Sequence, residues 1–117
     1  MRDTAPEGTG EQLTRTLKEH GLTVRTLVSH HYDEYRIVVD VEGGAEIRIA
    51  DEDGRIDRST DEHGGWVAVY RPHGDRSDEG ETCIYESEGM PPAFKQDTAA
   101  LVAVVVQCAE AHRRVPV

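Results

Sequence analysis

Apolar and polar residues alternate strictly in the middle of the chain. Within Tyr35–Val41 apolar or aromatic side chains occupy every second position, and the same spacing continues through Ala45–Ala50. A period of two is typical of a β-strand that buries one face. Gly43-Gly44 lies between the two runs and suits a tight hairpin turn. The pattern predicts an antiparallel hairpin over Tyr35–Ala50 with its aliphatic face inward.

Three further segments have strand character. Val24–Ser29 alternates in the same way, Gly65–Arg71 is rich in valine and aromatic residues and ends at Pro72, and Thr82–Ser87 forms the last run. Polar turn residues separate these runs. Together with the hairpin they predict a sheet of four or five strands.

Both ends of this strand region carry a helical pattern. The first helix is expected over about Gly10–His20, with Thr9 as its N-cap and Gly21 as the residue that ends it. The second is expected from Thr98 to about Arg114, after an N-cap at Asp97. The second helix has an unusually wide apolar arc, so burial against other elements must offset the low helix propensity of its valines.

The order helix, strands, helix predicts an α+β fold. Sequential strands joined by short turns form an antiparallel meander, and both helices then lie on one face as a two-layer sandwich. We expect residues 1–8 to be a flexible N-terminal tail and residues 9–115 to be a single domain. The 117 residues suffice for one domain but not for two ordinary ones.

Charge limits the classes of partner. The chain has 23 acidic and 13 basic residues and a formal net charge of −10. Direct binding to nucleic acid or to an anionic membrane is therefore not expected, because both need a cationic surface. The acidity lies in the central loops: Asp40–Glu62 contains nine acidic residues and three arginines. These loops are either solvated turns that keep the domain soluble or a negative surface for a basic partner.

Cysteine usage and the N-terminal pattern indicate the cytoplasm. No apolar segment follows Met1, and the longest apolar run, Ala99–Val106, is far shorter than the roughly 20 residues that span a bilayer. Cys83 and Cys108 are too far apart for a C-x-x-C motif. We expect two free thiols that pack as small apolar groups.

No motif for catalysis, metal binding or a cofactor is recognisable. The chain contains no G-x-S-x-G elbow, no phosphate-binding glycine loop and no H-x-x-x-H or H-E-x-x-H spacing. His30 and His31 are adjacent, and adjacent strand residues point to opposite faces. We therefore predict no catalytic residue, no metal ligand and no cofactor.

The leading hypothesis is a non-enzymatic protein-binding module that forms a homodimer. It would contact a protein partner through the open face of the sheet or through the C-terminal helix. In architecture and acidity the predicted domain resembles the small acidic secretion chaperones, which are dimers that hold a segment of another protein. The residues predicted to contact the partner on the sheet face are Arg36, Trp66, Tyr70 and Tyr85. The alternative is that Trp66 and Tyr70 point to the core and that only Val67, Val69 and Arg71 face out.

Two alternatives belong to other classes. The first is an acidic mimic of nucleic acid that blocks a basic protein, using Asp51, Glu52, Asp53, Asp57, Asp61 and Glu62. The second is a small metal-binding protein or enzyme that uses His30, His31, His63 or His73.

Overall fold

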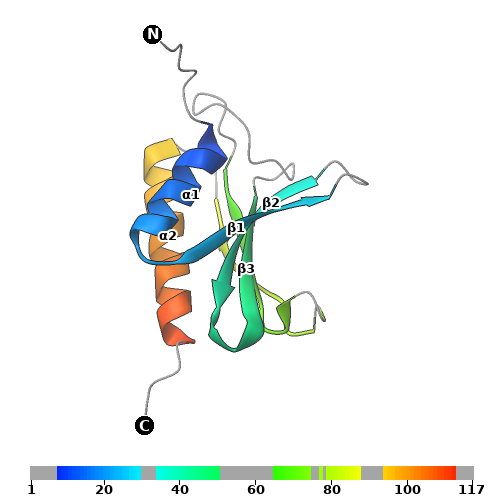
Figure 1. Cartoon of the computed structure of the whole chain (residues 1–117). Helices are drawn as coiled ribbons and strands as arrows, with labels where there is room; N and C mark the ends of the chain where they lie inside the picture. Colours follow the sequence, from blue (N-terminus) through cyan, green and yellow to red (C-terminus); the bar gives the residue numbers. More distant parts are fainter. Residues whose placement is uncertain are drawn as a thin grey trace.

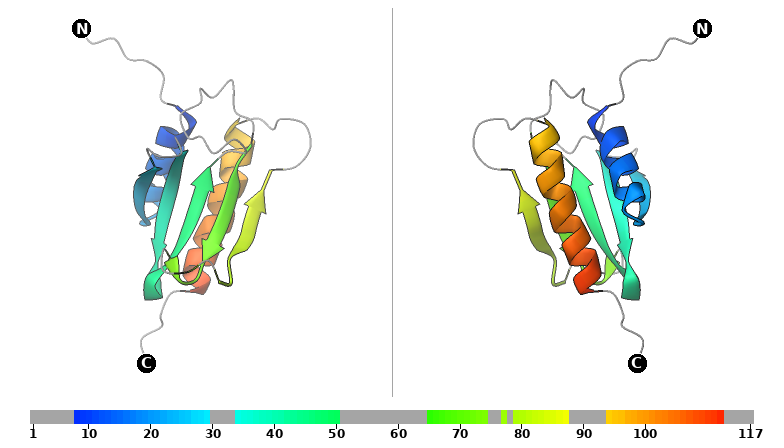
Figure 2. Two further views of the ribbon diagram at one scale, coloured as in Figure 1. Left: turned by 90° about the vertical axis from the view of Figure 1, so that its right-hand side faces the viewer. Right: turned by 90° about the vertical axis from the view of Figure 1, so that its left-hand side faces the viewer.

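Two layers make up the fold, a five-stranded sheet and a pair of helices that cover one of its faces (Figure 1). The computed structural model describes residues 8–29, 34–50, 65–74, 77, 79–87 and 94–112. Neither helix lies over the other face of the sheet (Figure 2). The predicted α+β sandwich is thus confirmed. The elements are α1 (Thr9–Glu19), β1 (Thr23–Ser29), β2 (Glu34–Val41), η1 (Glu42–Gly44), β3 (Ala45–Ala50), β4 (Val67–Arg71), β5 (Thr82–Glu86) and α2 (Phe94–Ala111).

The sheet is an antiparallel meander with the strand order β1-β2-β3-β4-β5. The predicted central hairpin is confirmed, with Ile37 paired to Ile49 and Val39 to Ile47, so that these aliphatic residues share one face. Its turn is one residue longer than a two-residue hairpin, because Glu42 joins the two glycines in a short 3-10 turn. Both glycines adopt left-handed angles, with φ of 87° and 88°.

Helix α1 ends as predicted but begins differently. The N–H of Gly21 donates to the Lys18 carbonyl and the N–H of Leu22 to the Leu17 carbonyl, a Schellman motif that needs the left-handed backbone of Gly21 (φ 83°). Thr9 is not the N-cap. It is the first helical residue and is buried, while Gly8 precedes it and no side chain caps the helix.

Helix α2 begins at Phe94, three residues before the predicted N-cap Asp97. Asp97 lies inside the first turn, where an acidic residue still interacts favourably with the helix dipole. The last described helical residue is Ala111, and the predicted end near Arg114 lies outside the described residues.

The hydrophobic core lies between the helices and the sheet. Leu13 and Leu17 of α1 and Leu101 and Val105 of α2 are fully buried in it. Each such side chain contributes about 1.5–3 kcal/mol by its burial. The sheet supplies the opposite wall of the core with Ile37, Val39, Val41, Ala45, Ile47, Ile49 and Ala68.

Candidate functional site

Trp66 lies in the core and not on the open face of the sheet. It is 1% exposed, and its indole Nε1 donates a hydrogen bond to Thr98 Oγ1 of α2 at 3.0 Å. The register explains this placement, because Ile49 pairs with Ala68 and Ile47 with Tyr70. Alternate residues of this segment therefore face the helices together with the isoleucines. The predicted placement of Trp66 on the open face is corrected.

Tyr70 and Tyr85 also pack against the core from the side that the helices cover. The Tyr70 ring stacks on His112 at the end of α2, with ring centroids 4.4 Å apart and the planes 25° from parallel. Arg36 precedes the core residue Ile37 in β2, so it lies on the opposite face. Of the four residues predicted to contact a partner on the open face, only Arg36 lies there.

A buried polar cluster joins β5 to the first turn of α2. The carboxylate of Asp97, a residue only 4% exposed, accepts a hydrogen bond from Tyr85 Oη at 2.5 Å and lies 2.6 and 2.7 Å from Ser87 Oγ. Ser87 Oγ also accepts the backbone N–H of Trp66 at 2.7 Å. Among the described residues, no histidine contacts this serine to activate it as a nucleophile. The cluster therefore connects the sheet to the first turn of α2.

The Tyr85 phenol in this cluster predicts a fall in stability at alkaline pH. Burial, the hydrogen bond to Asp97 and the charge of Asp97 raise the pKa of Tyr85 from 10.0 to about 12. The folded state thus holds this proton more tightly than the unfolded chain. The resulting stabilisation is fully present below pH 10 and is lost as the pH rises towards 12. We expect the urea midpoint of the wild type to fall more steeply over this interval than that of Tyr85→Phe. Parallel pH profiles would contradict this role of Tyr85.

Both cysteines are free thiols, as predicted, but they are less buried than expected. Cys83 is exposed and pairs with Val69 on the open face of the sheet, while Cys108 is half-buried. Burial raises the pKa of Cys108, which keeps it in the unreactive thiol form. The ring nitrogen Nδ1 of His112 lies 2.8 Å from the Cys108 carbonyl oxygen and 3.9 Å from the sulfur. These contacts do not form an activated cysteine.

The residues of the two alternative hypotheses lie largely outside the described part of the chain. Within that part, no group of three histidine, cysteine, aspartate or glutamate residues is placed to hold a metal ion. His73 is described and exposed in the turn after β4. The predicted residues outside the described part are His30, His31, His63, Asp51, Glu52, Asp53, Asp57, Asp61 and Glu62.

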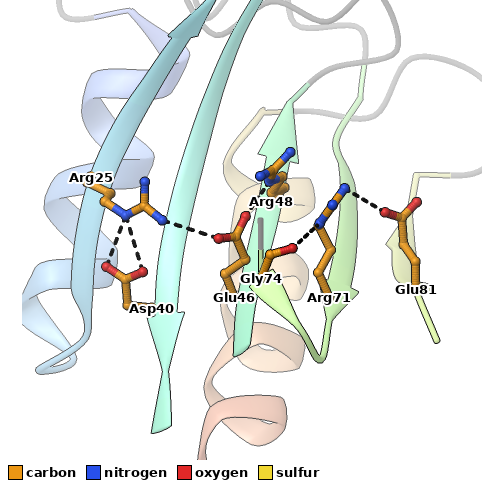
Figure 3. A network of polar contacts seen from close by, with 7 residues as sticks. All are labelled: Arg25, Asp40, Glu46, Arg48, Arg71, Gly74 and Glu81. Atoms are coloured by element: carbon orange, nitrogen blue, oxygen red, sulfur yellow. Dashed lines mark hydrogen bonds and ion pairs between the residues drawn. The ribbon is translucent and has the colours of Figure 1, made fainter. Parts of the chain in front are cut away.

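The open face of the sheet carries an ionic network (Figure 3). Glu46 is 3% exposed and lies between two arginines: Arg25 Nη2 donates to it at 3.2 Å and Arg48 Nε also donates to it. Arg25 additionally pairs with Asp40 at 3.2 Å. The Arg25–Asp40 pair is a diagonal contact between neighbouring strands, which long side chains can reach. The Arg25–Glu46 contact spans from β1 to β3 across β2, and Arg48 and Glu46 lie two positions apart on β3.

A second group of polar contacts lies closer to the other edge of the sheet (Figure 3). Arg71 of β4 donates to the Gly74 carbonyl at 3.1 Å and pairs with Glu81 at 2.8 Å. Val38 lies between Arg25 and Arg48 in one cross-strand row and is fully buried. The charged residues in this part of the open face are therefore paired within the protein.

The helical layer contains a groove of about 590 Å³ between α1 and α2. Both helices begin at the same end of the sheet and run side by side over it (Figure 2). Residues of both helices line the groove. Val102 of α2 is buried at the groove, Val106 is half-buried, and Ala99 and Ala103 are exposed. The residues that line the groove are Gln12, Thr16, His20, Phe94, Lys95, Thr98, Ala99, Val102, Ala103, Val106 and Gln107.

The hydroxyl groups that line the groove are already used inside the protein. Thr16 Oγ1 donates to the Gln12 carbonyl of its own helix at 3.0 Å, and Thr98 Oγ1 accepts the indole N–H of Trp66. The wall formed by α2 is therefore mainly aliphatic. This wall is the part of the apolar arc of α2 that the sheet does not cover.

Comparisons of the chain with protein-family models, curated proteins and solved structures find no match. Neither described helix has the length and apolarity needed to cross a membrane.

Proposed function

We propose that the protein is a non-enzymatic, cytoplasmic protein-binding module whose α1–α2 groove holds the apolar face of a partner's helix. The observation that carries the proposal is the aliphatic stripe that α2 leaves uncovered in this groove. Ala99, Val102, Ala103 and Val106 follow the spacing i, i+3, i+4, i+7, which places them on one face of α2. Helix-in-groove recognition uses a stripe of the same spacing on the partner.

The shape of the groove favours a helix over a compact small molecule. The lining residues of α2 extend from Phe94 to Gln107, which corresponds to about 20 Å at the helical rise of about 1.5 Å per residue. This length matches more than three turns of a second helix. The small side chains of Ala99 and Ala103 allow the backbone of a second helix to approach within the usual 8–10 Å.

The open sheet face supports the proposal less well. Its described central charges, Glu46 above all, are paired within the protein, and three of the four residues predicted to act there face the helices. The second surface named by the sequence hypothesis, the C-terminal helix, is therefore the better supported one. A homodimer would be a competing use of this same surface.

A labelled model peptide tests the proposal directly. We would use an 18-residue amphipathic helix with a leucine stripe and a glutamine polar face, and measure its binding by fluorescence anisotropy. We expect saturable binding that Ala103→Trp weakens by about tenfold or more, because the indole would fill the groove. Ala100→Trp is the matched control, since Ala100 is exposed on α2 but does not line the groove.

Two results would overturn the proposal. One concerns the peptide assay: either the peptide does not bind, or the two tryptophan variants lose binding equally. The other is a dimer in sedimentation velocity that Ala103→Trp dissociates and Ala100→Trp does not. That result would identify a second copy of the chain as the occupant of the groove.

A further inference from the structure

We infer that the partner's helix is acidic at the positions that flank its apolar stripe, although this chain itself has a net charge of −10. The inference rests on the proposed function and specifies the chemistry of the partner. It follows from the local charge of the groove, which differs from that of the whole chain.

The titratable groups that line the groove are basic. Lys95 lies on the first turn of α2 and His20 directly after the end of α1, and the lining residues that the structure describes include no carboxylate. Lys95 is exposed and forms no ion pair within the described part of the chain. Its charge is therefore available to a carboxylate on a helix that enters the groove.

The helical layer around the groove is close to neutral. Its two helices contain four acidic and three basic residues, and the buried Asp97 is one of the four acidic ones. Most of the acidity of the chain lies in other segments. Because salt screens exposed charges beyond about 10 Å at 0.1 M, the groove's own charges dominate at contact distance. An acidic helix can thus bind an acidic protein here.

Three peptides with the same leucine stripe separate local charge from total charge. Their flanking polar residues are glutamine, glutamate or lysine. We expect the glutamate peptide to bind about 1.5-fold to fivefold more tightly than the lysine peptide at 0.1 M salt, the range expected for exposed ion pairs. Attraction by the net charge of −10 would produce the opposite order.

Two charge-matched variants assign the effect to the groove. Lys95→Gln and Lys18→Gln remove the same charge from exposed positions, but only Lys95 lines the groove. We expect Lys95→Gln to abolish the preference for glutamate and Lys18→Gln to keep it.

The outcomes distinguish this inference from the proposed function. If all three peptides bind equally and Ala103→Trp still blocks their binding, the inference of an acidic partner is wrong, while the proposal that the groove binds a helix stands. Tighter binding of the lysine peptide would also overturn the inference, because it would show that the net negative charge of the whole chain attracts the peptide. If no peptide binds, the proposed function falls together with the inference.

Discussion

Replacing Trp66 with alanine should lower the free energy of unfolding by about 3–5 kcal/mol, the range for large aromatic residues in a core. Trp66 is 1% exposed and packs between the sheet and α2. The substitution would create a cavity and would remove the indole donor to Thr98. Because small domains are stable by only about 5–15 kcal/mol, the variant should be marginally folded. Urea denaturation followed by far-ultraviolet circular dichroism measures the change.

Two control variants make this result interpretable. Trp66→Phe keeps an aromatic ring in the core and should lower the free energy of unfolding by less than Trp66→Ala. Val67→Ala changes the next residue, which is half-buried, and should lower the free energy of unfolding by less than either Trp66 variant. A Trp66→Ala variant that kept the wild-type urea midpoint and only lost binding to a partner would contradict the core position of Trp66.

The strands were predictable because their pattern is local. In β2 and β3 the apolar side chains recur at every second position, and each run ends at glycine or a polar turn. The end of α1 was predictable for the same reason, because Gly21 itself adopts the left-handed backbone conformation that ends the helix. These features depend on neighbouring residues, so the sequence alone contains them.

The faces of β4 required information from another strand. Residues 66–71 alternate Trp, Val, Ala, Val, Tyr and Arg, so both faces are apolar enough to be buried. The pairing with β3 decides between them, because Tyr70 pairs with the buried Ile47 and Arg71 with Glu46. Glu46 belongs to the ionic network of the open face, which suits the arginine. The sequence alternative in which Trp66 and Tyr70 point to the core and Arg71 faces out is therefore the one that the structure shows.

The sequence pattern predicts only part of the groove. The wide apolar arc of α2 is visible in the sequence. Which residues remain uncovered depends on where α1 packs, and this position follows from tertiary contacts of Leu13 and Leu17. The exposed Ala99 and Ala103 could not be separated from the buried Leu101 and Val105 without it.

The beginning of α2 shows how a distant contact can override a local rule. Asp97 is a favourable N-cap residue by type, yet the helix starts at Phe94. The Asp97 carboxylate is instead hydrogen-bonded to Tyr85 and Ser87, which lie 12 and 10 residues earlier in the chain. A capping rule that considers only the next three residues cannot detect such partners.

The position of Asp97 leads to a second large expected effect. Asp97→Ala should lower the free energy of unfolding by about 2–4 kcal/mol. It removes an acceptor that is 4% exposed and leaves the hydroxyls of Tyr85 and Ser87 without their carboxylate. Urea denaturation measures the change, and Gln96→Ala, an exposed neighbour on the same turn, should change the midpoint very little.

A double-mutant cycle tests whether the cluster acts as one unit. Ser87→Ala alone should cost less than Asp97→Ala, because Tyr85 still donates to the carboxylate. In the Asp97→Ala background, Ser87→Ala should lower the free energy of unfolding by less than it does in the wild type, since its hydrogen bond to Asp97 is already lost and only the acceptor of the Trp66 N–H remains to be removed. Strictly additive effects, or an Asp97→Ala variant as stable as Gln96→Ala, would contradict the conclusion that this cluster joins β5 to α2. Because Thr98, next to Asp97, lines the groove and Asp97→Ala would weaken this join, the variant should also weaken binding of the model peptide.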